Sequence, residues 1–380
     1  MFAEGIPTGE QSSVGSNAIL INHLIILFNT CILLNMSRFR DHKVLTLLLV
    51  NAIIFIILLI ILEISARIFY PQIMPLGNES RKFWEYDSLL GWSHKPNVKD
   101  IQTIAYSTID ISINSKKLRD SDYDYKRNTK NRVLVLGDSF AWGFGVNKNE
   151  RFSEIIERSF ESLEIINSAV PGYSTDQQLL YYINEGYKYN PDFVLLLFCE
   201  NDFLGNSLNQ IHWYNKPFYT YANGNLKLNS VPVPNQSFYQ SLRKFLSGKS
   251  YLISFILKRF TLFNAQSFSS TEFSFSNSAL ITEKLVEKLN NECNENGSKL
   301  LIANIPMDKE KVQFLTKVSK VNSINYLDLS PLFKDETNYL IPDDGHWNAK
   351  GNLLAANEIT KWFRQFGILS HNIVAADSIR

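Results

Sequence analysis

The sequence predicts an α/β fold in which helices cover both faces of a central sheet. From Asn131 onward, short apolar runs alternate with helical stretches of about ten residues or more. Two of these runs, VLVLG at 133–137 and FVLLLF at 193–198, are apolar without alternation, which is typical of strands buried on both faces. Strands that alternate with helices of this length indicate a parallel sheet.

The predicted elements follow one another in a regular order. The strands are expected at 133–137, 164–170, 193–198, 299–305 and 324–330. The helices between and after them are expected near 150–163, 176–188, 281–294 and 348–366.

One segment, residues 205–277, interrupts this alternation. It contains PFYTYANGNLKLN, in which an Asn-Gly pair between alternating residues predicts a β-hairpin, and then LRKFLSGKSYLISFILKRF, which predicts one or two amphipathic helices. We interpret the segment as an insertion over one end of the sheet. Two roles are open for its aromatic side chains, stacking on sugar rings or a small satellite core; the side chains concerned are Tyr214, Phe218, Tyr219 and Tyr221.

The expected organisation of the chain has five parts. They are an N-terminal segment (1–43), a membrane anchor (44–69), a lead-in that packs on the catalytic domain (70–130), the catalytic domain with its insertion (131–368) and a tail (369–380). The lead-in holds LGWSHKPN and a short alternating stretch, STIDISIN, that predicts an edge strand.

Composition excludes several classes of function. Lys and Arg number 38 and Asp and Glu 37, a net charge of +1, which argues against an extended nucleic-acid surface. Hydrophobic residues reach 45%, which excludes a disordered chain. The three cysteines form no C-x-x-C pair, and neither an H-E-x-x-H motif nor a phosphate-binding glycine loop is present in the sequence. We therefore expect no metal and no organic cofactor.

The run from Val44 to Leu62, VLTLLLVNAIIFIILLIIL, predicts a transmembrane helix. Nineteen uncharged residues form a helix of roughly 28 Å, close to the roughly 30 Å of a bilayer's hydrocarbon core. The run is apolar on every face, unlike an amphipathic core helix. Arg38, Arg40 and Lys43 precede it, so the positive-inside rule places the chain after about Tyr70 outside the cytoplasm.

Alternatives remain open at this end of the chain. A cleaved signal peptide fits less well, because the run is long and lacks a clean A-x-A site, although Ile64-Ser65-Ala66 leaves cleavage open. The apolar stretch 18–34 is either a first membrane helix, which would make a hairpin, or an upstream extension of a chain that starts at Met36. We favour a single anchor.

Two side chains after predicted strands suggest nucleophilic catalysis. Ser139 lies in GDSF directly after the first strand, where it is either a nucleophile or a helix N-cap. A serine hydroxyl needs a base, and His346 in PDDGHWN precedes the closing helix. Asp343, three residues before His346, reaches back to the imidazole across one turn, whereas the adjacent Asp344 is less well placed. A solvated histidine in an acidic loop is the alternative.

Two further residues follow the next strands. Gly172 in VPGYST offers a backbone N–H, and Asn201 in CEND offers a side-chain amide, as donors to a developing oxyanion. Taken singly, a Pro-Gly turn explains Gly172 better than a catalytic role does, and a helix N-cap at Asn201-Asp202 explains Asn201 better. Cys199 ends an apolar strand and precedes Glu200, which favours packing over reactivity.

Together, Ser139, Gly172, Asn201 and His346 resemble the SGNH (GDSL-like) hydrolase family, whose name lists these four residue types. The likeness covers about 131–366 without the insertion, and it departs where Cys199 replaces the usual glycine of the third block. The resemblance implies a flavodoxin-like three-layer sandwich. It also implies Ser139 as nucleophile, His346 as base, Asp343 as its partner, and an oxyanion hole made by the Ser139 and Gly172 N–H groups and the Asn201 side chain.

The expected function is a membrane-anchored, extracytoplasmic serine esterase that acts on an acylated substrate, with a carbohydrate polymer favoured. The lead-in LGWSHKPN and the anchor are similar to tethered members that modify surface polysaccharides. Two alternatives remain. The same triad would serve an O-acyltransferase that passes the acyl group to a sugar, and the fold would also serve a binding module without catalysis.

Overall fold

The computed structural model describes residues 42–70, 82–104, 107–127, 131–211, 214–247, 249–257, 259, 275–334, 336–342 and 344–369. The chain divides into two compact units at Tyr70 and Pro71. The stretch 18–34, Met36 and most of the predicted tail lie outside the described residues.

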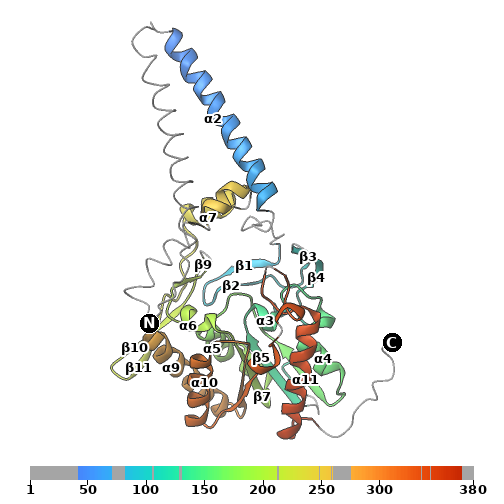
Figure 1. Ribbon diagram of the computed structural model, residues 1–380. Coiled ribbons are helices and arrows are strands. Elements are labelled where there is room, and N and C mark those ends of the chain that lie inside the picture. The colour runs from blue at the N-terminus through green and yellow to red at the C-terminus, as the bar shows by residue number, and fades with distance from the viewer. Residues whose placement is uncertain are drawn as a thin grey trace, which may run out of the picture. The chain divides into compact units, whose positions relative to one another are not determined.

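Among the described residues of the first unit, α2 (His42–Phe69) is a long apolar helix, drawn in blue in Figure 1. An 18-residue window within Thr46–Phe69 has a mean hydropathy of 3.1, and none of that window is buried. By length and composition this helix is able to cross a membrane.

The second unit is built on a five-stranded parallel sheet (Figure 1). The strands are β5 (Asn131–Gly137), β6 (Leu163–Asn167), β7 (Phe193–Phe198), β12 (Lys299–Asn304) and β13 (Asn325–Asp328). They lie in the order β13-β12-β7-β5-β6, and each neighbouring pair is parallel. This is the doubly wound order of flavodoxin-like folds, so the predicted α/β class and its five strands are confirmed.

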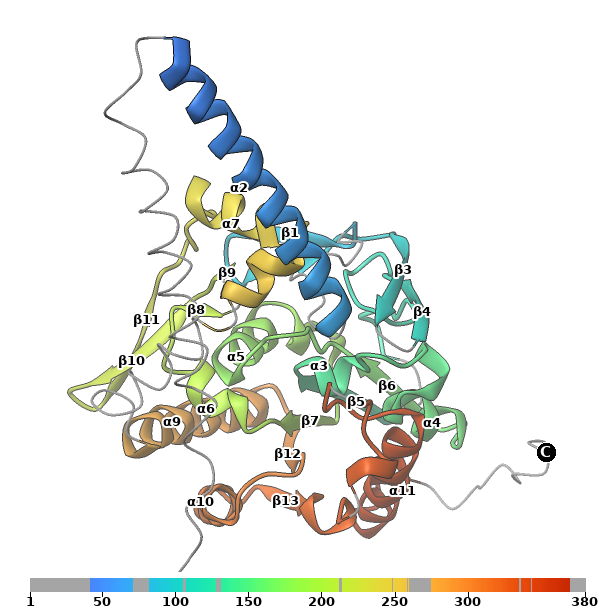
Figure 2. The same ribbon diagram turned by 45° about the horizontal axis from the view of Figure 1, so that its top comes forward.

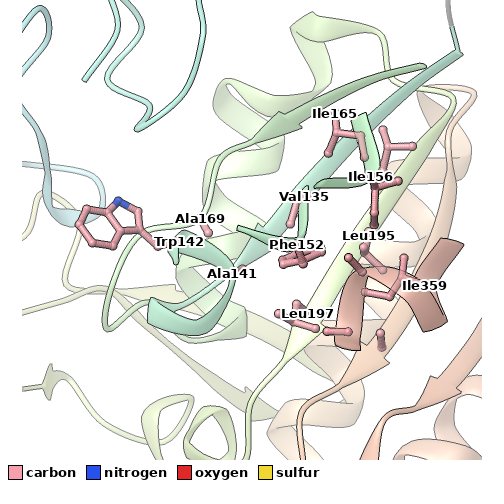
Figure 3. Packing of buried hydrophobic residues seen from close by; sticks show 14 of the residues in the cluster. Val135, Ala141, Trp142, Phe152, Ile156, Ile165, Ala169, Leu195, Leu197 and Ile359 are labelled. Carbon is pink, nitrogen blue, oxygen red and sulfur yellow. The ribbon is translucent and has the colours of Figure 1, made fainter. Parts of the chain in front are cut away.

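Helices cover both faces of the sheet, as predicted. One face packs against α4 (Phe152–Arg158) and α11 (Ala349–Gln365), and the other against α5 (Thr175–Asn184), α9 (Phe275–Glu295) and α10 (Lys309–Val321). Each strand contributes side chains to both hydrophobic cores, because successive side chains point to opposite faces of the sheet. Figure 3 shows Val135, Leu195 and Leu197 against Phe152 and Ile359 on the first face, while Leu134 and Leu196 lie on the second.

The predicted helices differ from the observed ones mainly at their ends. The helix expected near 150–163 is shorter, because α4 ends at Arg158 and β6 begins at Leu163. Helix α9 starts at Phe275, six residues earlier than expected. The expected element list lacks α10, whose buried Leu315 and Val318 face the sheet.

The lead-in contributes two antiparallel hairpins and part of both cores. Strand β1 (Trp84–Asp87) pairs with β2 (Gly91–His94), and β3 (Lys99–Ile104) pairs with β4 (Ser107–Ser112), which confirms a strand in STIDISIN. Its buried side chains pack on both sides of the sheet: Phe83, Ile109 and Ile111 on the α4 side, and Leu90 and Trp92 on the α5 side.

The segment 205–277 contains two hairpins and the predicted amphipathic helix (Figure 2). Strand β8 (Gln210–Ile211) pairs with β9 (Tyr214–Asn215), and β10 (Phe218–Ala222) pairs with β11 (Asn225–Asn229). The turn residues Asn223 and Gly224 both have positive φ, 53° and 80°, as a two-residue hairpin requires. Helix α7 (Phe238–Ser247) follows, and residues 251–257 are helical again.

A buried ion pair connects this segment to helix α5, which packs on the sheet. The Lys216 ammonium contacts the carboxylate of Asp176 in α5, and both side chains are fully buried. Lys216 Nζ also donates to the Gly205 carbonyl at 3.0 Å, at the end of the short helix α6 (Asn201–Gly205). The pair therefore links the segment to the helix that begins at Asn201.

Replacing Lys216 by Met is expected to destabilise the protein by about 3–5 kcal/mol, because it leaves the Asp176 carboxylate buried without a cation. Urea unfolding followed by tryptophan fluorescence measures the change. The control is Lys227→Met, at an exposed position on β11, where a change within about 0.5 kcal/mol is expected. Equal midpoints for the two variants would show that the buried pair contributes nothing.

Candidate active site

Three of the predicted site residues follow three adjacent strands of the sheet. Ser139 follows β5, Gly172 follows β6 and Asn201 follows β7, and β5 lies between the other two strands. Because parallel strands end at one edge of a sheet, the topology brings the three residues to the same edge. The loops and short helices that follow these strands determine the orientation of Ser139, Gly172 and Asn201.

Ser139 is the first residue of the short helix α3 (Ser139–Trp142). Asp138 caps this helix, since its Oδ1 accepts the Phe140 N–H at 2.9 Å. Gly137 leaves no room for a side chain, because a Cβ there would lie 2.6 Å from the Ala141 Cβ. The serine is therefore presented at a tightly packed strand-to-helix turn.

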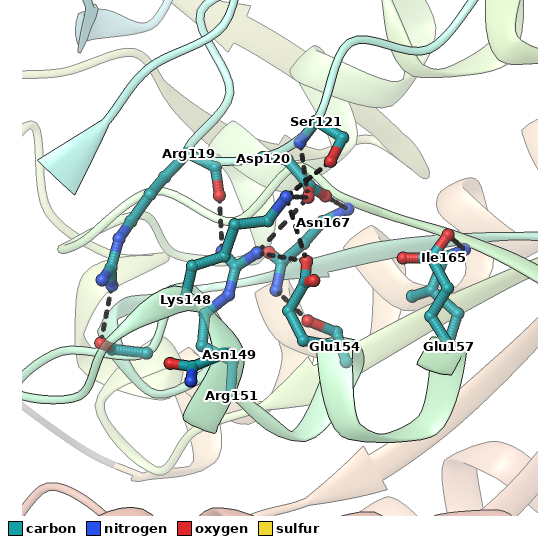
Figure 4. A network of polar contacts seen from close by, with 12 residues as sticks. Arg119, Asp120, Ser121, Lys148, Asn149, Arg151, Glu154, Glu157, Ile165 and Asn167 are labelled. Carbon is teal, nitrogen blue, oxygen red and sulfur yellow. Dashed lines mark hydrogen bonds and ion pairs between the residues drawn. The ribbon is translucent and has the colours of Figure 1, made fainter. Parts of the chain in front are cut away.

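The carbonyls at the end of α3 are held by side chains from elsewhere in the fold. Arg119 of the lead-in donates to the carbonyls of Trp142 and Gly143 at 3.2 and 2.8 Å, and Asn167 Nδ2 donates to that of Ala141 at 2.7 Å. Figure 4 shows the surrounding polar network, in which Asp120 accepts the Asn167 N–H at 2.7 Å. Burial raises the pKa of Asp120 to about 6, although the nearby Arg151 opposes the shift. These contacts fix the turn that carries Ser139.

The structure brings His346 to Ser139 from the far end of the sequence. His346 Nε2 lies 2.7 Å from Ser139 Oγ, within hydrogen-bond distance. The imidazole packs against the rings of Phe140 and Phe144, with centroids 4.7 and 4.6 Å away. Next to it, the Trp347 indole stacks on Phe333 in the core. The histidine is thus held on one side by the turn that carries Ser139 and on the other by the buried Trp347.

The other imidazole nitrogen, Nδ1, contacts the carboxylate of Asp344. Asp344 Oδ1 also accepts the His346 N–H at 3.2 Å. Burial alone would raise the pKa of Asp344, but the hydrogen bonds and charge of His346 outweigh it, so this pKa lies below its usual value. Asp343, the partner expected from the sequence, lies outside the described residues, and its role stays a prediction. Asp344, which the sequence places less well, is the carboxylate in contact with His346.

Asn201 is hydrogen-bonded to Asp138, the residue that caps the Ser139 turn. Its Nδ2 donates to Asp138 Oδ2 at 3.1 Å, which orients the amide and leaves its second hydrogen for another acceptor. Burial raises the pKa of Asp138, opposed by these hydrogen bonds and by the nearby His346. Cys199 is buried against the same carboxyl, and burial raises the pKa of its thiol well above the usual value. The predicted packing role of Cys199 is confirmed.

Gly172 occupies a turn that only glycine adopts readily. Its φ is +81°, and the Tyr173 N–H donates to the Val170 carbonyl at 3.1 Å, as in a type II turn with Pro171 and Gly172 at its centre. The Pro171 carbonyl accepts from Trp92 Nε1 at 3.0 Å. Because N–H and C=O point in opposite directions across a trans peptide, this bond directs the Gly172 N–H away from Trp92.

Three residues that contact the site were absent from the sequence-based predictions: Arg119, Trp92 and Asp138. A fourth, Asp344, was considered there but ranked below Asp343. Asp138 was within reach of sequence reasoning, since it belongs to the same GDSF block as Ser139. Arg119 and Trp92 lie in the lead-in, and only their tertiary contacts show what they hold. Across the described residues, no three His, Cys, Asp or Glu side chains gather as a metal-binding group.

The class of the protein, an ester-bond hydrolase, is shown by a match of its sequence to a family model. Residues 133–359, more than half of the chain, match the family described as GDSL-like Lipase/Acylhydrolase. The chain therefore belongs to this family, which confirms the resemblance drawn from the four sequence blocks.

Solved structures of similar proteins include a lipase/acylhydrolase from Enterococcus faecalis, with 14% identity over 64% of this chain and 98% of that one and a TM-score of 0.40. The psychrotrophic esterase EstA from Pseudoalteromonas sp. has 12% identity over 62% of this chain and 98% of its own, with a TM-score of 0.38. The acetyl xylan esterase AlAXEase has 13% identity, coverage of 61% and 98%, and a TM-score of 0.38. No curated protein matches the chain.

Proposed function

We propose that the protein is a membrane-anchored serine esterase that removes acyl groups from a carbohydrate outside the cytoplasm. The observation that carries the proposal is the 2.7 Å contact between Ser139 Oγ and His346 Nε2. Serine is a weak nucleophile at its ordinary pKa, and an imidazole at this distance accepts its proton. A carboxylate of the Asp343–Asp344 pair orients the imidazole, and Asp344 is the one in contact.

The proposed reaction has two halves. In the first, Ser139 Oγ attacks the ester carbonyl while its proton moves to His346 Nε2, and the alcohol leaves with that proton. In the second, His346 takes a proton from water, the hydroxide attacks the acyl-enzyme, and the carboxylic acid leaves as Ser139 regains its proton. The carboxylate on Nδ1 stabilises the imidazolium that forms in each half.

Three donors are proposed to stabilise the tetrahedral oxyanion: the Ser139 N–H, the Gly172 N–H and the free amide hydrogen of Asn201. The turn at Gly172 and the bond from Asn201 to Asp138 both fix donor directions before substrate arrives. Donors that are already oriented cost no reorganisation during the reaction, and each contributes roughly 10²–10³ in rate.

The anchor supports the proposed location, and the exposure of the site supports a bulky substrate. The basic residues before α2 and the positive-inside rule support a hydrolase domain outside the cytoplasm. Asn201 is exposed and Asp344 is 30% exposed, so a bulky acylated polymer has access to the catalytic side chains. Tyr214 and Tyr219 pack into the α5-side core, which favours the satellite-core role over sugar stacking for these two rings.

The test uses the full chain in detergent with a fluorophosphonate probe and a series of acyl esters. We expect the probe to label Ser139 and to block release of acetate from acetylated oligosaccharides. Mass spectrometry of the products with a sugar acceptor present separates hydrolysis from transfer. Acylated acceptor as the main product would replace the esterase by an acyltransferase, and no labelling of Ser139 would overturn serine catalysis.

Replacing Trp92 by Phe is expected to lower kcat about five-fold with little change in KM. The variant removes the donor that holds the Pro171 carbonyl, a bond of about 1 kcal/mol, and so loosens the direction of the Gly172 N–H. The control is Tyr173→Phe, which removes a hydroxyl bonded to the Trp92 carbonyl and leaves the Pro171 carbonyl in place. Steady-state kinetics and unfolding of both variants check the prediction; equal kcat losses would assign Trp92 a purely structural role.

A further inference from the structure

Helix α7 (Phe238–Ser247) presents apolar side chains to solvent. Phe238 is 82% exposed, Tyr239 68% and Phe245 63%, while Leu242 and Leu246 are also exposed. At 100° per residue these five side chains fall within an arc of roughly 120°, and Ser241 and Arg243 lie outside it. The exposed face of α7 is therefore continuous and apolar. We call these five residues the α7 face.

The start of α7 is fixed to the rest of the domain. Ser237 and Gln240 form a capping box: the Gln240 N–H donates to Ser237 Oγ at 3.2 Å, and the Ser237 N–H donates to Gln240 Oε1 at 2.6 Å. Gln240 Nε2 also donates to Asn215 Oδ1 of β9 at 3.1 Å, and Asn215 Nδ2 donates to the Pro234 carbonyl at 2.9 Å. The helix thus holds its apolar face outward from an anchored base.

The charge of this part of the chain matches an anionic surface. Residues 238–259 carry five Lys or Arg and no Asp or Glu: Arg243, Lys244, Lys249, Lys258 and Arg259. An amphipathic helix with basic residues and aromatic and leucine side chains on one face is the pattern of helices that lie in a bilayer interface. Basic residues near an anionic bilayer are attracted to its surface.

We propose that the α7 face lies in the headgroup region of an anionic phospholipid bilayer, the same bilayer that α2 crosses. The inference rests on the proposed membrane anchorage. Eleven residues, 71–81, connect Tyr70 to the hydrolase domain, and fully extended they span roughly 40 Å. So short a tether keeps α7 at a high effective concentration near the lipid surface, so that modest apolar burial suffices for binding.

The experiment reads the depth of three positions in the full chain, reconstituted in vesicles of phosphatidylcholine with or without phosphatidylglycerol. Single cysteines replace Phe245 in the α7 face, Ile56 in α2 and Val321 at the end of α10, each in a Cys31→Ser background; Cys199 and Cys293 are buried. Val321 is 75% exposed and serves as the control, because α10 and α7 lie at opposite ends of the domain (Figures 1 and 2). Each cysteine carries an environment-sensitive nitrobenzoxadiazole label, and nitroxide lipids quench labels that enter the bilayer.

We expect nitroxide lipid to reduce the fluorescence of the label on Phe245→Cys by about half, because such helices bury about 5–10 Å into the interface. The reduction is expected to be stronger with phosphatidylglycerol present. The Val321→Cys label is expected to stay unquenched. Quenching at position 56 without quenching at position 245 would overturn the inference and leave the anchor intact. An unquenched label at position 56 would overturn the anchor and the inference with it. A blue-shifted label at position 245 that nitroxide lipid does not quench would show that protein covers the face, which contradicts a lipid partner.

Discussion

Ser139→Ala is expected to lower turnover of a small acyl ester by about 10⁴-fold or more, because the reaction then lacks the group that attacks the carbonyl. The variant keeps the GDSF turn, since Asp138 caps α3 through the Phe140 N–H and the Ser139 hydroxyl takes no part in the cap. Circular dichroism and the urea midpoint are expected to match those of the parent protein. The initial rate of ester cleavage and the loss of fluorophosphonate labelling are the measurements.

A serine outside the site provides the matched control for this variant. Ser159 is exposed and bonds only locally, to the Ile155 carbonyl at 2.8 Å, so Ser159→Ala is expected to keep both rate and labelling. If Ser139→Ala retained turnover within about ten-fold of the parent, the nucleophile would be another group or water itself, and the acyl-enzyme mechanism would be abandoned.

Asp344→Asn is expected to lower kcat by about 10²–10⁴, because the amide neither stabilises the imidazolium nor fixes the tautomer of His346. The contact between Asp344 and Nδ1 is the basis of this expectation. Initial rates of ester cleavage at saturating substrate, compared with those of the parent protein, check the expectation.

The neighbouring carboxylate provides the comparison. With Asp344 as the partner, Asp343→Asn is expected to keep kcat within about ten-fold of that of the parent protein. The reverse pattern, a large loss in Asp343→Asn and a small one in Asp344→Asn, would restore the three-residue spacing predicted from the sequence. It would also show that the loop around Gly345 rearranges during catalysis.

Most of the architecture was predictable from hydrophobic patterning. The strands at 133–137 and 193–198 are central in the sheet and apolar on both faces, and that pattern depends little on tertiary context. The shared location of Ser139, Gly172 and Asn201 was predictable for a related reason: each follows one of three adjacent parallel strands, and topology brings their ends to one edge. The roles of Gly172 and Asn201 came only from the family resemblance.

The remaining features depend on contacts that leave no periodic signal. Helix α10 is an exception. Its buried Leu315 and Val318 have helical spacing, so the same pattern analysis could have predicted it. The contact of Asp344 arises from the loop, where Gly345 has a φ of +91° and Asp344 Oδ1 bonds the His346 N–H two residues on. Spacing in the sequence carries no information about such a local bend.

The position of Arg119 sets a lower limit on the size of the enzyme. A fragment that starts at Val133, where the family match begins, would keep Ser139 and His346 but discard the guanidinium that bonds the carbonyls of Trp142 and Gly143. The Gly143 carbonyl would keep the Val146 N–H at 3.3 Å, but the Trp142 carbonyl would lose its guanidinium donor. A buried carbonyl without a donor costs about 1–3 kcal/mol, and here that cost falls on the four-residue helix that begins at Ser139. A catalytically active fragment of this chain is therefore expected to be longer than the family match. A fragment that begins at Val133 lacks the side chain that supports the Ser139 turn.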